Sequence, residues 1–113
     1  MILRQILVID DNGSVRDAMD RILEDLGYLP FPAVDRSEAL EMMSSVNFSA
    51  AVIDYKLGED NAGEVLRERH PGLPVIVMSG KASEDELQTL VGGEANGYLR
   101  KPFTRDQLGS VLT

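Results

Sequence analysis

The sequence of 113 residues is long enough for one domain with a hydrophobic core, and we expect a single domain over residues 1–113. Its formal net charge of −8 argues against direct nucleic-acid binding, and the absence of cysteine excludes disulfides and thiolate metal sites. No apolar run approaches the length of a membrane span, and no room is left for a signal peptide, so a cytoplasmic location is the default expectation.

The first predicted strand ends at a pair of acids. Residues 5–9 form a mostly apolar run that predicts a buried strand, and Asp10 and Asp11 follow it directly. Apolar side chains then recur at helical spacing over residues 14–26, and Gly27 marks the end of this predicted helix.

Residues 28–33 predict a short second strand. Because Pro30 and Pro32 have no N–H group to donate to a neighbouring strand, we expect this strand at an edge of the sheet. Asp35 and Glu38 have the spacing of a capping box and mark the start of a second helix. Its predicted apolar face consists of Ala39, Leu40, Met43 and Val46.

Two further apolar strands are predicted in the middle of the chain, and both end in polar residues. Residues 50–54 form a buried strand whose last residue is Asp54, and residues 74–79 form another that ends at the hydroxyl of Ser79. Between them we expect a helix over residues 62–70, which ends before a proline.

The last third of the chain continues the alternation. Capping-box spacing at Ser83 opens a helix over residues 83–91, and a weaker strand over residues 95–101 ends at Lys101. Thr104 and Gln107 are expected to cap a final helix over residues 104–112. Five strands thus alternate with five helices. This order predicts an α/β fold in which a parallel sheet is covered by helices on both faces.

Five polar side chains follow the ends of these predicted strands: Asp10, Asp11, Asp54, Ser79 and Lys101. In a parallel sheet the carboxyl ends of the strands meet at one edge, where ligands bind in open α/β sheets. We therefore expect three carboxylates, one hydroxyl and one ammonium around a single crevice.

Such a cluster needs neutralisation. Two unit charges about 4 Å apart repel by roughly 4 kcal/mol at an effective dielectric constant of 20, so the site must raise a carboxylate pKa or bind a cation. Oxygen ligands without histidine or cysteine favour Mg²⁺. The arrangement suits phosphoryl transfer in which Asp54 attacks, the metal and Lys101 neutralise the phosphoryl oxygens, and Ser79 donates to one of them.

Each of these residues also has a simpler structural explanation when it is taken alone. Asp11 or Asn12 could cap the first helix, Ser79 could belong to a turn, and Lys101 could be a solvated surface residue. His70 is interpreted as a helix-end residue and not as a ligand. The joint placement of the acids, the hydroxyl and the lysine at one edge favours the functional interpretation.

The sequence resembles the receiver domain of two-component response regulators over nearly its whole length. The matching motifs are Ile9-Asp10-Asp11-Asn12, Asp54 with Leu57 and Gly63, Ser79-Gly80, and Tyr98-Leu99-Arg100-Lys101-Pro102-Phe103. The resemblance implies a doubly wound, flavodoxin-like (βα)5 fold with the strand order 2-1-3-4-5.

The resemblance also implies chemical roles. Asp54 would be the phosphoacceptor, phosphorylated from a phosphohistidine on a sensor histidine kinase or phosphotransfer protein. Mg²⁺ would be held by Asp11, Asp54 and the main-chain carbonyl of Lys56, with Asp10 acting largely through water. Such a protein acts chemically on its own phosphate and is not a turnover enzyme.

For the signalling step, the resemblance implies that Lys101 contacts the phosphoryl group and that Ser79 and Tyr98 form a switch pair. The surface formed by the last two helices and the last strand would then change its partner, an output domain or a second copy. Phosphorylation provides the charge that drives such a change. The Lys101–Pro102 peptide bond is commonly cis in these domains.

Some features depart from the family pattern or leave alternatives. Gly58 stands where the family often has proline, and the last helix is short and contains Gly109, so whether a longer protein continues beyond Thr113 stays open. Lys56 and Lys81 occupy positions that influence phosphate loss in the family.

One alternative function is a small phosphatase with an aspartate nucleophile, although the acid two residues after Asp10 that it would need is absent. The other is a receiver-like docking module that is never phosphorylated.

Overall fold

The computed structural model describes residues 4–55, 66, 68–81, 83, 85–87 and 95–112. The elements within this part of the chain are β1 (Arg4–Ile9), α1 (Gly13–Asp25), β2 (Tyr28–Ala33), α2 (Arg36–Met43), β3 (Ala50–Asp54), β4 (Val75–Ser79), β5 (Gly97–Arg100) and α5 (Arg105–Leu112). All five strands lie where the sequence predicted them, with ends that differ by a few residues at most.

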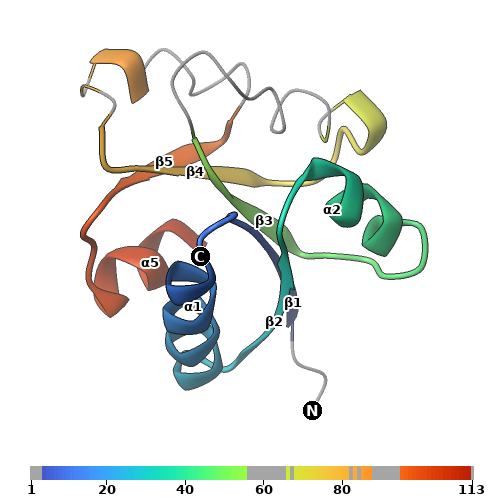
Figure 1. Ribbon diagram of the computed structural model, residues 1–113, viewed down its shortest axis with the longest axis horizontal. Helices are drawn as coiled ribbons and strands as arrows, with labels where there is room; N and C mark the ends of the chain where they lie inside the picture. The colour runs from blue at the N-terminus through green and yellow to red at the C-terminus, as the bar shows by residue number, and fades with distance from the viewer. Residues whose placement is uncertain are drawn as a thin grey trace.

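The strands form one parallel sheet in the order β2-β1-β3-β4-β5 (Figure 1). This confirms both the parallel α/β sheet predicted from the alternation of elements and the strand order implied by the resemblance. β1 pairs with β2 on one side and with β3 on the other, so that Ile9 lies opposite both Ala33 and Ile53. The acid pair therefore follows a central strand.

Helices cover both faces of the sheet. α1 and α5 lie beside each other on one face and α2 lies on the opposite face (Figure 1). Successive side chains of a strand point to opposite faces, so Ile6 and Val8 of β1 pack with α1 and α5, whereas Leu7 and Ile9 pack with α2. Because both faces are buried, β1, β3 and β4 are nearly continuous apolar runs.

Side chains at the helix ends define where α1 starts and stops. The Oδ1 atom of Asn12 accepts hydrogen bonds from the N–H groups of Ser14 and Val15, which satisfies two donors of the first turn. At the other end Gly27 has a φ of 90°, a conformation that favours glycine. Asn12, one of the two candidates from the sequence, is therefore the cap.

Side chains expected at the starts of the other helices also make capping hydrogen bonds. Ser83 and Glu86 exchange hydrogen bonds of 3.1 and 3.3 Å between side chains and N–H groups, and Thr104 and Gln107 exchange bonds of 2.8 and 3.1 Å. Asp35 accepts from the N–H group of Glu38 at 2.8 Å. Each helix start predicted from this spacing is confirmed.

The prediction that the apolar face of α2 extends to Val46 is wrong, because the helix ends at Met43. The hydroxyl groups of Ser44 and Ser45 donate to the carbonyls of Glu41 and Met42. Serine hydroxyls compete in this way for carbonyls of the last turn, which disfavours continuation of a helix.

Several expectations fall outside the described residues. They concern most of the predicted helix over residues 62–70 and the end of the helix over residues 83–91, including Val65, Leu90, Val91, Gly92 and Gly93. Of the apolar residues expected on these helices, Leu66 and Leu87 are described, and both are fully buried on the face of the sheet that α2 covers.

β2 forms an edge of the sheet, as its prolines predicted. The carbonyl of Ala33 accepts from the N–H group of Asp10, so the polar groups of Ala33 face β1. Polar groups alternate in direction along a strand, and Pro32 and Pro30 lie one and three residues earlier. The two prolines therefore occupy outward-facing positions, where a missing N–H group removes no hydrogen bond from the sheet.

None of the described helices has the length and apolar character needed to cross a membrane.

Candidate functional site

The candidate site lies at the edge of the sheet where the parallel strands end. Asp10 and Asp11 follow β1, Asp54 is the last residue of β3, Ser79 is the last residue of β4, and Lys101 follows β5. The structure therefore places all five sequence-predicted side-chain positions at the same edge, the one at which open α/β sheets bind ligands.

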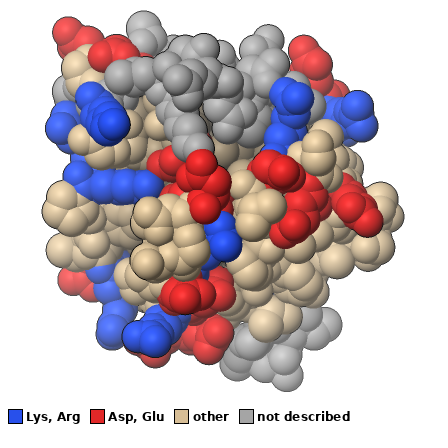
Figure 2. Space-filling model, in the orientation of Figure 1, with Lys and Arg blue, Asp and Glu red and all other residues tan. Residues whose placement is uncertain are grey.

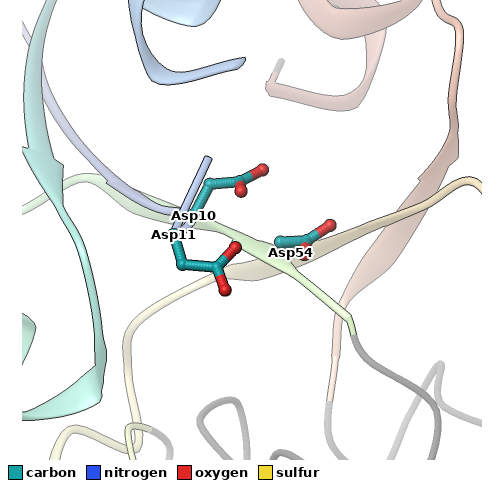
Figure 3. A group of neighbouring side chains, drawn as sticks. All are labelled: Asp10, Asp11 and Asp54. Atoms are coloured by element: carbon teal, nitrogen blue, oxygen red, sulfur yellow. The ribbon is translucent and has the colours of Figure 1, made fainter. Parts of the chain in front are cut away.

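Three carboxylates form the centre of this site. Asp10, Asp11 and Asp54 each contribute an oxygen, and these atoms lie within 4.8 Å of one another. Asp10 and Asp11 leave the end of β1, Asp54 leaves the end of β3, and their side chains project in the same general direction (Figure 3). Asp10 is buried, Asp54 is half-buried and Asp11 is exposed, so the cluster opens toward solvent on one side.

Lys101 neutralises part of this charge. Its Nζ atom lies 2.7 Å from Oδ1 of Asp54 and 3.2 Å from Oδ2 of Asp10. Burial on its own would lower the pKa of Lys101, but the hydrogen bonds and charges of Asp54 and Asp10 together raise that pKa above its ordinary value. The ammonium group therefore stays charged, and two negative charges of the cluster remain uncompensated by it.

The carboxylate of Asp10 is held by contacts at both oxygens. Its Oδ1 atom accepts from the N–H group of Asn12 at 2.9 Å, and its Oδ2 atom accepts from Lys101. The residue is only 2% exposed. Asp10 thus anchors the lysine beside Asp54.

The sequence analysis missed one contact of the acid pair. Nη1 of Arg16, in the first turn of α1, donates to the main-chain carbonyl of Asp10 at 2.5 Å. A basic residue one helical turn after the capping residue Asn12 was the available signal. That signal is weak, because arginine in a first turn normally opposes the helix dipole and extends into solvent.

Ser79 and Tyr98 lie on neighbouring strands close to the cluster. β3 and β4 pair so that Asp54 lies opposite Met78, which places Ser79 one residue further along. Ser79 is 1% exposed, and its hydroxyl accepts from the N–H group of Lys81 at 3.2 Å. Tyr98 is half-buried and packs against the core on the α2 face.

The remaining site expectation concerns the loop after β3. Lys56, whose main-chain carbonyl was expected to bind the metal, lies outside the described residues, as do Leu57, Gly58 and Gly63. The Lys101–Pro102 peptide bond is cis, which agrees with the resemblance noted in the sequence.

The donor atoms of the cluster fit a metal ion of a particular kind. All three are carboxylate oxygens, and hard divalent cations prefer such ligands over the nitrogen and sulfur ligands that zinc and copper favour. On the face of the molecule in Figure 2, acidic side chains gather across the centre and right, with basic side chains between and around them.

A family model described as the response regulator receiver domain matches residues 6–113. The chain belongs to this family. Receiver domains are signalling modules of two-component systems, and the acidic cluster fits the phosphorylation site of such a domain.

The chain is similar to response regulators of different lengths. A putative NtrX-like response regulator of Rickettsia conorii is 33% identical over 113 residues, which cover 96% of this chain and 24% of that protein. The chemotaxis protein CheY of Pseudomonas aeruginosa is 33% identical over 110 residues, which cover 92% of this chain and 89% of CheY. The chain therefore spans less than a third of the NtrX-like relative and most of CheY.

Solved structures share the fold of this receiver domain. CheY4 of Vibrio cholerae superposes with a TM-score of 0.86 at 24% identity, covering 98% of this chain and 97% of CheY4. The beryllofluoride-activated NtrC4 receiver domain dimer superposes with a TM-score of 0.85 at 28% identity, covering 96% of this chain and 92% of that one.

Proposed function

We propose that this receiver domain is a phosphorylation-dependent switch and that Asp54 accepts the phosphoryl group. The donor is a phosphohistidine on a sensor histidine kinase or phosphotransfer protein. The observation that carries the proposal is the position of Lys101, whose ammonium lies 2.7 Å from Asp54 inside a cluster of three carboxylates. This combination supports the proposal, because the proposed nucleophile lies beside a fixed positive charge and a candidate cation site.

In the proposed transfer, an oxygen of Asp54 attacks the phosphorus atom of the phosphohistidine. The P–N bond breaks, and the imidazole nitrogen keeps the electron pair and takes up a proton. Lys101 already contacts Oδ1 of Asp54, so we assign the attack to Oδ2. The ammonium of Lys101 is then beside the incoming phosphoryl oxygens and stabilises their charge.

Mg²⁺ is the proposed cofactor, and it would supply further neutralisation of the phosphoryl oxygens. We propose Asp11, Asp54 and the main-chain carbonyl of Lys56 as its direct ligands. Asp10 would act through water, because both oxygens of its carboxylate already accept hydrogen bonds.

The proposed switch couples the new phosphate to a surface. The Ser79 hydroxyl would move from the N–H group of Lys81 toward the phosphoryl oxygens, and the Tyr98 ring would turn inward behind it. Tyr98 lines a groove of about 550 Å³ between β5 and α5, together with Arg100, Pro102, Phe103, Asp106, Gln107, Ser110 and Val111. A change at Tyr98 would therefore change the shape of an exposed surface.

We propose that this surface of β5, α5 and the helix starting near Ser83 binds an output domain or a second copy of the chain. The fold is shared with the NtrC4 receiver domain dimer, which supports the second possibility. We further propose that residues 1–113 form one domain, that it works in the cytoplasm, and that it catalyses only its own phosphorylation and dephosphorylation.

The decisive experiment is incubation of the protein with Mg²⁺ and a small acyl phosphate, followed by intact mass spectrometry. We expect a single phosphoryl adduct that is absent without Mg²⁺ and absent in Asp54→Asn. A folded wild-type protein that takes up no phosphoryl group would instead indicate a docking module. Continuous release of phosphate from an added phosphomonoester would favour a phosphatase.

A further inference from the structure

Arg16 makes a contact whose purpose the proposed phosphoryl chemistry does not explain. It belongs to the first turn of α1, yet its guanidinium turns back to the end of β1, where Nη1 donates to the carbonyl of Asp10. A Cβ atom on Gly13 would lie 3.5 Å from Nη2, so the guanidinium also lies against the start of the helix. The side chain is half-buried.

The accepting carbonyl belongs to the peptide unit that joins the two acids. A peptide unit is planar, so fixing the direction of the Asp10 carbonyl also fixes the direction of the Asp11 N–H group and of the bond that leads to the Asp11 Cα atom. The Asp10 side chain is held separately by Asn12 and Lys101. Arg16 therefore acts on the orientation of Asp11 more than on that of Asp10.

We propose that Arg16 is a positioning residue for the acid pair, because it holds the Asp10–Asp11 peptide in the plane that turns Asp11 toward Asp54. The inference rests on the proposed Mg²⁺ site. It predicts that Arg16, although cationic, strengthens binding of a cation. Without the contact, the Asp10–Asp11 peptide could turn in other directions, and the Asp11 carboxylate would spend less time near the shared position.

The charge of Arg16 and its proposed positioning role predict opposite effects on Mg²⁺ affinity, so an experiment can distinguish them. A positive charge near three carboxylates disfavours a second cation, so a purely electrostatic role predicts that removing Arg16 tightens Mg²⁺ binding. Positioning predicts weaker binding instead, since residues that orient metal ligands commonly change affinity by about 10-fold or more.

The experiment measures the Kd for Mg²⁺, titrated as the chloride at constant ionic strength, for wild type, Arg16→Ala, Arg16→Lys and Arg21→Ala. Arg21 is the matched control, because it is an exposed arginine on the same helix and its loss changes the net charge equally. We expect a Kd roughly 10-fold higher for Arg16→Ala. We expect a smaller increase for Arg16→Lys, which keeps a charged donor, and none for Arg21→Ala.

Folding and site geometry are followed alongside. Denaturant unfolding checks that each variant is folded, and the amide resonance of Asp11 in metal-free protein should shift in Arg16→Ala and stay in place in Arg21→Ala. If Arg16→Ala does not fold, the Kd of Arg16→Lys for Mg²⁺ tests the proposal. A role through charge alone predicts the wild-type Kd for this variant, whereas a positioning role predicts a higher one.

An unchanged or tighter Kd in a folded Arg16→Ala variant would overturn the positioning role while leaving the proposed function intact. A wild-type protein that binds no Mg²⁺ would overturn both. Uptake of a phosphoryl group by wild type, measured on the same sample, separates these two failures.

Discussion

The three carboxylates of the site have different surroundings. Both oxygens of Asp10 accept hydrogen bonds, Asp54 shares Lys101 with Asp10, and Asp11 is exposed. Hydrogen bonds at both oxygens hold the buried carboxylate of Asp10 in one position, whereas the exposed carboxylate of Asp11 can be reached from solvent. Asp10 thus anchors Lys101, Asp54 is the proposed nucleophile, and Asp11 is the proposed metal ligand that is most exposed to solvent.

The first prediction concerns Asp54→Asn. We expect it to abolish phosphorylation and to leave the metal-free free energy of unfolding equal to that of wild type or higher. It removes one of three clustered negative charges, and Lys101 keeps its bond to Asp10. Denaturant unfolding in the presence of a chelator measures this, with Glu41→Gln at an exposed position of α2 as the control of equal charge change. A clearly less stable Asp54→Asn protein would contradict the account of the cluster.

The second prediction concerns Asp20, on α1. Burial, followed by the charges of Asp17 and Glu24, raises its pKa above the ordinary 3.8, and its Oδ1 atom is buried without a hydrogen-bond partner in the described part of the chain. A carboxyl whose pKa is raised in the folded state destabilises that state when it is charged. Asp20→Asn should therefore raise the free energy of unfolding at neutral pH by less than about 1 kcal/mol, since the residue is partly exposed.

The pH dependence gives the control for Asp20. The gain from Asp20→Asn should be largest above the raised pKa and should disappear as the pH falls below 3.8, where the acid is neutral in both states. Unfolding curves of wild type and variant, recorded across this range, measure it. A gain that is independent of pH would mean that charge is not the cause.

At the scale of elements, β2 shows how the sheet ends. The backbone groups of positions 30 and 32 face outward, and both residues are prolines. This edge therefore presents carbonyl groups at these positions but lacks the N–H groups that another strand would need for pairing. Replacing both, as Pro30→Val with Pro32→Thr, should therefore allow pairing of two edges and concentration-dependent self-association. Sedimentation velocity measures this, with Leu29→Thr as the control because the N–H group of Leu29 faces β1. A monomeric double variant would show that other features protect this edge.

Two glycines allow opposite predictions for the helices of the α1/α5 face. A Cβ on Gly109 of α5 would lie 3.6 Å from Leu26, an ordinary contact, so Gly109→Ala should raise the free energy of unfolding by about 1 kcal/mol through helix propensity. A Cβ on Gly27 would meet nothing within 4 Å, but the φ of 90° strains any other residue. Gly27→Ala should therefore destabilise by about 1 kcal/mol or more. Denaturant unfolding compares both variants, and equal signs would contradict this reasoning.

Helix starts and the edge strand could be predicted from the sequence, because a few neighbouring residues determine each of them. The capping pairs at Ser83 and Thr104 and the edge position of β2 followed directly from residue type and spacing. The strand order did not, because neighbouring strands are chosen by packing across the whole sheet, and it came from the family resemblance. The end of α2 was misjudged because the hydroxyls of Ser44 and Ser45 outweighed a favourable apolar spacing. The Arg16 contact depends on the path of the turn after β1, which no spacing rule specifies.

At the scale of the whole molecule, a ligand that binds only the folded state stabilises it. The carboxylates of the candidate site come from β1 and β3, so an unfolded chain does not hold them together. Mg²⁺ at one hundred times its Kd should raise the free energy of unfolding by about 2.7 kcal/mol. Denaturant unfolding with and without Mg²⁺ measures this, and Asp11→Asn should lose most of the effect. An equal gain in that variant would place the bound cation elsewhere.

Lys101 and Asp10 touch although 91 positions separate them in the chain. During synthesis all three acids emerge well before the lysine, and the contact also requires β5 to join the sheet, which is a long-range step of folding. Until β5 joins the sheet, the acids that follow β1 and end β3 lack their fixed countercharge. In the proposed mechanism, the domain would therefore become competent for phosphorylation only once the last strand has joined the sheet, and incomplete or misfolded copies would take up no phosphoryl group.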